Sequence, residues 1–179
     1  MGSFFSALEQ ESRDQFYDVI MLLILTGQRK TNVLAMRWQD IDLTAKTWSV
    51  PGELMKNGQT LTIALTEKEV AILERRVDKK TNDFVFPSPG KRGHYIEPKR
   101  RWQELLERAQ ISDFHIHDLR RTLASYMANS GANVALIQSA LNHKDLQTTL
   151  KVYAKVARRA ELEAREKAHE LMLSSLKIA

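Results

Sequence analysis

A histidine and an arginine three residues apart, His117 and Arg120, form a pair that could bind an anion and react with it. Residues three apart lie on one face of a helix, so both side chains can face one ligand. The guanidinium would hold the anion with two parallel hydrogen bonds, and the imidazole would transfer a proton beside it. Arg29 far upstream, and His143 and Tyr153 just downstream, are further candidates. The pattern predicts a site that binds a phosphodiester.

The composition of the chain limits the classes of protein to which it can belong. Its 179 residues, 43% of them hydrophobic, predict a single domain over residues 1–179. The absence of cysteine excludes a disulfide framework and a thiolate metal site, and agrees with a cytoplasmic protein. The longest apolar run, residues 19–25, is too short to span a membrane, so no membrane partner is expected. A net charge of +5 favours a polyanionic partner.

The elements that must position these residues are mostly helices. Apolar periodicity, turn signals and a capping box formed by Thr66 and Glu69 predict helices over residues 16–26, 30–36, 67–78, 97–109, 117–129, 133–141 and 146–156. Residues 38–42 read as a polar turn, and residues 84–86 as a short strand. Two β-branched stretches, residues 47–50 and 60–65, flank an Asn-Gly pair that predicts a hairpin. The fold class is therefore mainly α with a small antiparallel β-sheet, an α+β arrangement.

Two further segments are rich in charge. Residues 91–101 are predicted to form a basic loop that contacts the polyanion through Lys91, Arg92, Lys99, Arg100 and Arg101. Residues 158–176 are predicted to form a charged helix with an alanine stripe. That helix could pack on the body of the protein as an ordinary surface helix, or it could dock on a neighbouring protomer.

Six separated motifs occur in the order seen in tyrosine recombinases of the phage integrase type, which the chain resembles over residues 16–156. They are Thr26-Gly27-Gln28-Arg29, residues 38–42, Lys56-Asn57-Gly58, residues 117–122, Leu141-Asn142-His143 and residues 149–153. The resemblance implies a mostly helical catalytic core over residues 16–156 and a C-terminal helical tail over residues 157–179. It also implies that the domain cuts and rejoins DNA through a 3′-phosphotyrosine, with neither metal nor nucleotide cofactor.

The resemblance implies that Tyr153 is the nucleophile and that Arg29 and Arg120 clamp the phosphate. A phenol with a pKa of about 10 is a poor nucleophile at neutral pH. Cations that stabilise the developing charge are therefore required, and guanidinium groups match the non-bridging phosphate oxygens. Considered alone, Arg29 could instead cap the helix that precedes it.

The same resemblance assigns proton transfer to three further residues. Lys56 would protonate the leaving 5′-oxygen, His117 would act as a general acid or base, and His143 would donate a hydrogen bond to the phosphate. A flexible lysine on a hairpin can reach a leaving oxygen, which needs a proton to depart. An isolated Lys56-Asn57-Gly58 would more often be an ordinary turn.

Other residues compete for these roles. His115 and His117 could suggest a metal site, but no acidic third ligand stands at a recognisable spacing. Tyr17, Tyr95 and Tyr126 are alternative nucleophiles. At 100° per residue Tyr126 points away from the face that carries His117, so it is expected to lie in the core.

The chain departs from the family pattern at two positions. Asn32 replaces an acidic residue that usually stands three residues after the first arginine, and it could hydrogen-bond Arg29 or a histidine without supplying charge. Asn142 replaces the glycine before the second histidine. Asparagine tolerates the left-handed conformation that a helix end often needs, so the geometry is expected to survive.

The resemblance also bears on partners. It implies double-stranded DNA attachment sites as the substrate, and self-association as a tetrameric synapse on DNA in the full-length protein. Family members usually carry an N-terminal DNA-binding domain, which is expected to be missing from this chain. Two alternatives remain open: a non-catalytic DNA-binding module of the same fold, and a type IB topoisomerase-like strand transferase.

Overall fold

The computed structural model describes residues 1–55, 58–142, 150, 154, 162 and 165–174. These residues belong to two units, residues 1–120 and residues 121–179, called here the first and the second unit. The prediction of one catalytic domain over residues 1–179 stays a prediction. Among the described residues, no helix combines the length and the apolar character needed to cross a membrane.

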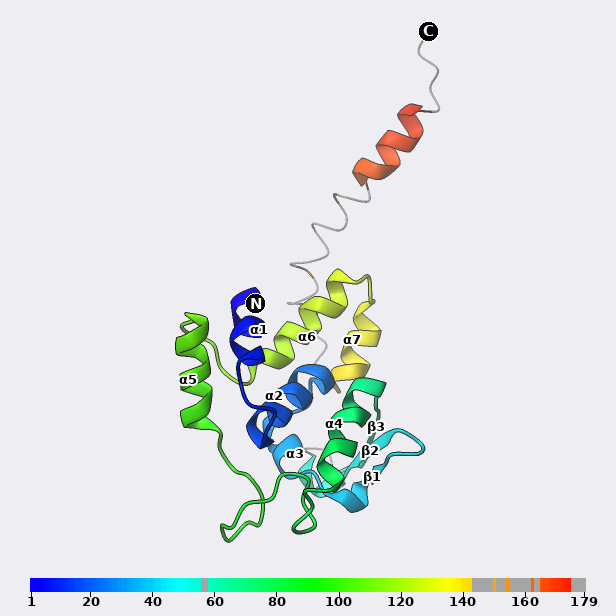
Figure 1. Cartoon of the computed structure of the whole chain (residues 1–179). Helices are drawn as coiled ribbons and strands as arrows, with labels where there is room; N and C mark the ends of the chain where they lie inside the picture. The colour runs from blue at the N-terminus through cyan, green and yellow to red at the C-terminus, as the bar shows by residue number, and fades with distance from the viewer. Residues whose placement is uncertain (56–57, 143–149, 151–153, 155–161, 163–164, 175–179) are drawn as a thin grey trace. The chain divides into compact units, whose positions relative to one another are not determined.

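The first unit contains five complete helices and a small sheet (Figure 1). The helices are α1 (Gly2–Glu9), α2 (Gln15–Thr26), α3 (Lys30–Leu34), α4 (Glu67–Val77) and α5 (Lys99–Ala109). The predicted helices over residues 16–26, 30–36, 67–78 and 97–109 are confirmed to within about two residues at each end. The predicted capping box is present, since Thr66 and Glu69 each bond the backbone N–H of the other.

The sheet has three antiparallel strands in the order β1-β2-β3. They are β1 (Ile41–Asp42), β2 (Thr47–Val50) and β3 (Leu61–Ala64). Trp48 on β2 pairs with Ile41 on one side and Ile63 on the other, and its side chain is buried. The predicted hairpin strands are confirmed, and the fold is mainly α with a small antiparallel sheet as predicted.

Three predictions about local structure need correction. Residues 38–42 are not simply a turn, because a short 3₁₀ helix (Trp38–Asp40) leads directly into β1. Residues 84–86 form no strand of the sheet, since they pair with residues 36–38 only through an isolated bridge between Arg37 and Phe84. Helix α1 was not predicted, although Phe4 in it is fully buried.

Helix α1 packs on α5, and Figure 1 shows the two helices side by side. The ring of Phe4 lies 5.7 Å from the rings of both Trp102 and Phe114, measured between centroids. The aromatic cluster continues the core formed by the apolar face of α2, which includes Phe16 and Ile20. Burial of these large side chains fixes α1 and α5 on the same side of α2.

A buried carboxylate, Asp18, joins α2 to α4. Its side chain is 0% exposed and forms ion pairs with Arg75 and Arg76. The Arg76 side chain, 3% exposed, also donates hydrogen bonds to the Gln15 side chain at 3.0 Å and the Val85 carbonyl at 2.9 Å. Buried charges are tolerated when they are paired and hydrogen-bonded in this way. The network therefore ties two helices and the segment after α4 into one unit.

The second unit contains most of α6 (Asp118–Asn129) and all of α7 (Val134–Leu141), as predicted for residues 117–129 and 133–141. The two helices enclose a small core of Ala124, Ala128, Ile137 and Leu141. Residues 165–174 are also helical, in agreement with the predicted charged helix over residues 158–176. The predicted helix over residues 146–156 lies mostly outside the described residues.

The Asp18 network generates a prediction about stability. Asp18→Asn removes the negative charge and leaves Arg76 buried without its counterion, so the free energy of unfolding should fall by about 3 kcal/mol. Urea unfolding followed by circular dichroism measures the change. As a control, Lys46→Gln breaks the exposed pair with Glu67 and should change stability by less than about 1 kcal/mol. An Asp18→Asn variant as stable as Lys46→Gln would show that the buried network contributes little.

Candidate active site

The Thr-Gly-Gln-Arg motif forms the bend between α2 and α3. Helix α2 ends at Gly27, whose left-handed backbone (φ 60°, ψ 16°) is the conformation that glycine adopts without strain. The Thr26 hydroxyl accepts a hydrogen bond from the Gln28 N–H at 3.2 Å and donates one to the Leu22 carbonyl at 2.6 Å. Arg29 follows in an extended conformation as the N-cap of α3. Local geometry therefore sets the position of Arg29.

Arg120 reaches the same bend from the first turn of α6. Its side chain is 3% exposed, and its Nη1 donates a hydrogen bond to the Gly27 carbonyl. This bond joins residues 93 positions apart in the sequence. It fixes the Arg120 guanidinium beside Gly27, two residues before Arg29. The hydrogen bond therefore places Arg120 at the bend that carries Arg29.

Arg120 and Arg29 interact as two like charges. Burial, and secondly the positive charge of Arg29, lower the pKa of Arg120 from its ordinary value to about 10. Arg120 is still protonated at neutral pH. No carboxylate forms an ion pair with Arg29 in the part of the chain that the structure describes. The positive charge of Arg29 at this bend would therefore attract an anion.

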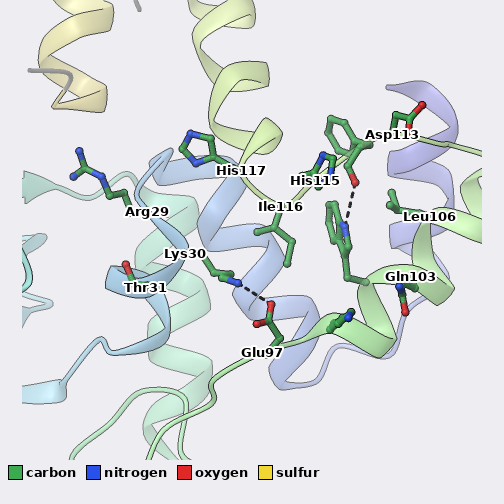
Figure 2. A pocket seen from close by; sticks show the side chains of 13 residues that line it. Arg29, Lys30, Thr31, Glu97, Gln103, Leu106, Asp113, His115, Ile116 and His117 are labelled. Atoms are coloured by element: carbon green, nitrogen blue, oxygen red, sulfur yellow. Dashed lines mark hydrogen bonds and ion pairs between the residues drawn. The ribbon is translucent and has the colours of Figure 1, made fainter. Parts of the chain in front are cut away.

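His117 lies immediately before α6 and has an exposed side chain. A turn over residues 115–118 positions it, since the Asp118 N–H donates to the His115 carbonyl and the Asp118 carboxylate accepts from the His115 N–H, both at 2.8 Å. The N-terminus of α6 adds a partial positive charge at this point. Figure 2 shows His117 and Arg29 on the same side of one cavity.

That cavity has a volume of about 660 Å³ and belongs entirely to the first unit. Its apolar wall comes from Trp102, Leu106, Phe114 and Ile116. Its polar wall includes, besides Arg29 and His117, the residues Lys30, Thr31, Glu97, Lys99, Gln103, Asp113 and His115. An anion bound at Arg29 and His117 would thus have room to continue as part of a larger molecule.

Three of the six predicted catalytic residues, Lys56, His143 and Tyr153, lie outside the described residues. The residues directly before Lys56 and His143, which are Met55 and Asn142, are described. Asn142 ends α7 in the left-handed conformation (φ 46°, ψ 50°), which confirms the expectation for this replaced glycine. Met55 is buried, and its sulfur accepts a hydrogen bond from the Asn32 amide at 3.6 Å.

The side chain of Asn32 does not make the hydrogen bonds that its sequence position suggested. Its side chain is almost fully buried, and in the described part of the chain it bonds Met55 and neither Arg29 nor a histidine. Its amide oxygen has no hydrogen-bond partner among the described residues. Asn32 therefore lies beneath the site, where it contacts the segment that leads to Lys56.

The predicted DNA-contacting residues fall into two groups. Lys91 and Arg92 are exposed in the loop between α4 and α5, as predicted. Lys99 and Arg100 are exposed but lie in the first turn of α5 and not in a loop, because α5 begins at Lys99. Arg100 also pairs with Glu104 one turn later at 2.9 Å. The roles of these residues remain predictions.

Arg101 has a different role from its neighbours in the basic run. It forms ion pairs with Glu11 and Asp14, and its guanidinium lies 4.5 Å from the centroid of the Phe16 ring. Those contacts are with the segment before α2 and with α2 itself. Arg101 therefore holds α5 in place and is not available to a ligand, which corrects its assignment to the basic contact loop.

The competing tyrosines differ in their surroundings. Tyr126 is 55% exposed, so the expectation that it lies in the core is wrong. The reason is that α6 buries Ala124 and Ala128, and a residue two positions from each lies on the opposite face. Tyr17 and Tyr95 are partly buried in the first unit, and burial raises the pKa of Tyr95. A raised pKa makes a phenol a weaker nucleophile at neutral pH.

The metal alternative receives no geometric support. Within the described residues, no group of three or more histidine, cysteine, aspartate or glutamate side chains could hold a metal ion. The Nδ1 atom of His115 instead lies 3.5 Å from the carboxylate of Asp118, three residues later in the chain.

Two residues of the cavity, Lys30 and Glu97, were not predicted from the sequence. They form an ion pair at 2.7 Å between segments 67 residues apart, which no local spacing could indicate. The available signal for Lys30 was its position directly after Arg29.

Comparison with known proteins places this geometry in a family. Residues 3–159 match the phage integrase family. The integrase of Salmonella phage P22 is 26% identical over 142 residues, which are 73% of this chain and 37% of that protein. A tyrosine recombinase of Thermosipho africanus is 28% identical over 169 residues, which are 93% of this chain and 59% of that protein. The chain thus spans about half the length of these relatives.

Solved structures show the same fold. The Tn1549 transposon integrase, determined in complex with a circular intermediate DNA, superimposes with a TM-score of 0.73 at 20% identity. The match covers 91% of this chain and 63% of the transposon integrase chain. Because the family match covers most of the 179 residues, the chain belongs to the phage integrase family.

Proposed function

We propose that this chain carries the catalytic centre of a site-specific DNA recombinase that cuts and rejoins DNA through a 3′-phosphotyrosine intermediate. The observation that carries the proposal is the buried Arg120 guanidinium, bonded to the Gly27 carbonyl and placed beside Arg29. Arg29 has no carboxylate partner among the described residues, so two guanidiniums at one bend form a site whose free energy falls when a phosphodiester binds. Membership of the phage integrase family and the name of the Thermosipho relative support the same reaction.

Arg29 and Arg120 bind the two non-bridging oxygens of the phosphate that reacts. Guanidinium groups remain charged and match this geometry with pairs of N–H donors. Their charge acts most strongly on the pentacovalent transition state, in which the negative charge on these oxygens increases. The Arg120–Gly27 bond positions the clamp before the substrate arrives, so little reorganisation is needed during the reaction.

The remaining groups make and break the bonds. The Tyr153 oxygen attacks phosphorus, and His117 accepts its proton as general base. The bond from phosphorus to the 5′-oxygen breaks as Lys56 donates a proton to that oxygen, and His143 donates a hydrogen bond to the phosphate. The product is a phosphotyrosine diester with a free 5′-hydroxyl. Because the number of phosphodiester bonds is unchanged, attack by a 5′-hydroxyl reverses the step without added energy.

The substrate of the longer protein is double-stranded DNA containing attachment sites. The Tn1549 integrase, which shares the fold, was determined with DNA bound, and the chain carries a net charge of +5 that suits such a partner. Lys91, Arg92, Lys99 and Arg100 contact backbone phosphates around the reacting one. Exchange of strands between two sites requires four active sites, so the longer protein acts as a tetramer on DNA.

The assignment of Tyr153 as the only nucleophile gives a direct test. Tyr153→Phe should eliminate the denaturant-stable adduct with a nicked duplex while it leaves affinity for the duplex within about twofold, since one hydroxyl contributes little to a phosphate-dominated interface. Denaturing gels measure the adduct, and anisotropy measures the affinity. Tyr126→Phe is the matched control and should form the adduct normally.

An adduct that persists in Tyr153→Phe would overturn the assignment of the nucleophile. A wild-type chain that binds DNA and forms no adduct would instead favour the non-catalytic module. Strand exchange between two specific sites in the longer protein separates a recombinase from a topoisomerase, which also forms the adduct.

A change of the leaving group tests the role of Lys56. Lys56→Ala should slow cleavage of ordinary DNA by about 10²-fold or more, the usual contribution of a general acid. Cleavage should recover on DNA with sulfur at the 5′-bridging position, because a thiolate leaves without a proton. Arg29→Ala and Arg120→Ala should show no such recovery, since they stabilise charge. If Lys56→Ala slows cleavage of both substrates equally, Lys56 only positions the phosphate.

The like-charge pair also predicts an effect on stability. A basic group whose pKa is lower in the folded than in the unfolded state destabilises the fold at pH values below its folded pKa. For Arg120 this destabilisation decreases as pH rises above about 10. Arg29→Gln removes part of the repulsion, so at pH 7 without DNA the free energy of unfolding should rise by about 0.5 kcal/mol.

Urea unfolding at pH 7 measures this change, with Lys99→Gln as the charge-matched control. Added phosphate should stabilise the wild-type chain more than Arg29→Gln, because the anion occupies the clamp. A loss of stability in Arg29→Gln, or equal stabilisation by phosphate in both proteins, would contradict the repulsion described here.

A further inference from the structure

Lys30 lies beside the proposed phosphate clamp. It is the first residue of α3, directly after the N-cap Arg29, and both side chains line the cavity that contains His117 (Figure 2). The two long cationic side chains extend in different directions, Lys30 toward Glu97, and both reach the wall of the same cavity (Figure 2). An anion that extends beyond Arg29 into the cavity would meet Lys30 next.

Cations exceed carboxylates on the cavity wall. Arg29, Lys30 and Lys99 face two acidic residues, Glu97 and Asp113. In the described part of the chain, Lys30 is the only one of these three cations with a carboxylate partner, the Oε1 of Glu97 at 2.7 Å. Glu97 therefore occupies the position on Lys30 that a phosphate oxygen would take.

The pair between Lys30 and Glu97 is open to solvent. The two side chains are 33% and 51% exposed, and exposed ion pairs contribute little to stability because water and salt screen them. Glu97 also lies outside regular structure, in the segment that precedes Pro98 and α5. A competing anion can therefore displace Glu97 without disturbing a helix or the core.

We propose that Lys30 binds a second backbone phosphate, next to the one held by Arg29 and Arg120, and that Glu97 covers this subsite until DNA displaces it. The inference rests on the proposed function, since it names an additional contact of the same site. Glu97 acts as an internal stand-in for phosphate in the free protein. It lowers the affinity of the site for any anion that cannot also contact the arginine clamp.

The proposal requires that Glu97 acts through Lys30, and a double-mutant cycle tests this requirement. Affinity for one duplex is measured for the wild-type chain, Lys30→Gln, Glu97→Gln and the double variant over a series of salt concentrations. Glu107→Gln removes the same charge from an exposed position of α5 outside the cavity, so it controls for net charge.

The expected results differ in direction for the two positions. Lys30→Gln should weaken binding, and the slope of log affinity against log salt should become shallower by about 0.9 because one phosphate contact is lost. Glu97→Gln should tighten binding by about two- to fivefold relative to Glu107→Gln, which is the range expected for release of an exposed pair. In the Lys30→Gln background, Glu97→Gln should have no more effect than Glu107→Gln.

Two outcomes would overturn the inference. One is an unchanged salt slope in Lys30→Gln, which would mean that Lys30 contacts no phosphate. The other is a full effect of Glu97→Gln in the Lys30→Gln background, which would reduce Glu97 to a general negative charge. The Tyr153 adduct of each variant is measured in parallel. If the wild-type chain forms no adduct the proposed function fails, whereas an adduct with either outcome above removes only the second phosphate subsite.

Discussion

The structure depends on keeping two positive guanidiniums, those of Arg29 and Arg120, close together at one bend. Arg120 is buried against the Gly27 carbonyl, and this burial, with the nearby charge of Arg29 as a second cause, lowers its pKa to about 10. Such a pair is stable only if the backbone around it is fixed by other interactions. The left-handed Gly27, the two hydrogen bonds of the Thr26 hydroxyl and the extended Arg29 supply that local rigidity.

Elsewhere in the first unit, ion pairs hold the helix that leads to this bend. Asp18 in α2 is buried against Arg75 and Arg76 of α4, and Asp14 at the start of α2 pairs with Arg101 of α5. Helix α2 is therefore fixed by paired charges at its N-cap and in its first turn, and it ends at the bend that carries Arg29. Arg75 and Arg76 form ion pairs within the fold, whereas Arg29 has no carboxylate partner among the described residues, a difference that net charge alone does not reveal.

Sequence reasoning succeeded where the determining interactions are local. The capping box of α4, the end of α2 at Gly27 and the left-handed Asn142 depend on residues within one turn, so composition and spacing predicted them. It failed where a contact joins distant segments. The pairing of Arg101 with Glu11 and that of Lys30 with Glu97 bridge 90 and 67 residues, and nothing near either residue in the sequence indicates them. The burial of α1 against α5 has the same origin.

Under the proposed function, the repulsion between the two arginines would also make the site selective. A site whose charge is already neutralised gains little binding free energy from an anion. A preorganised excess of positive charge instead binds most strongly the ligand with the greatest negative charge at the right distance. The transition state of phosphoryl transfer carries more negative charge on its non-bridging oxygens than the bound diester does. In the proposed reaction, the same interaction that destabilises the empty fold favours the transition state over the ground state.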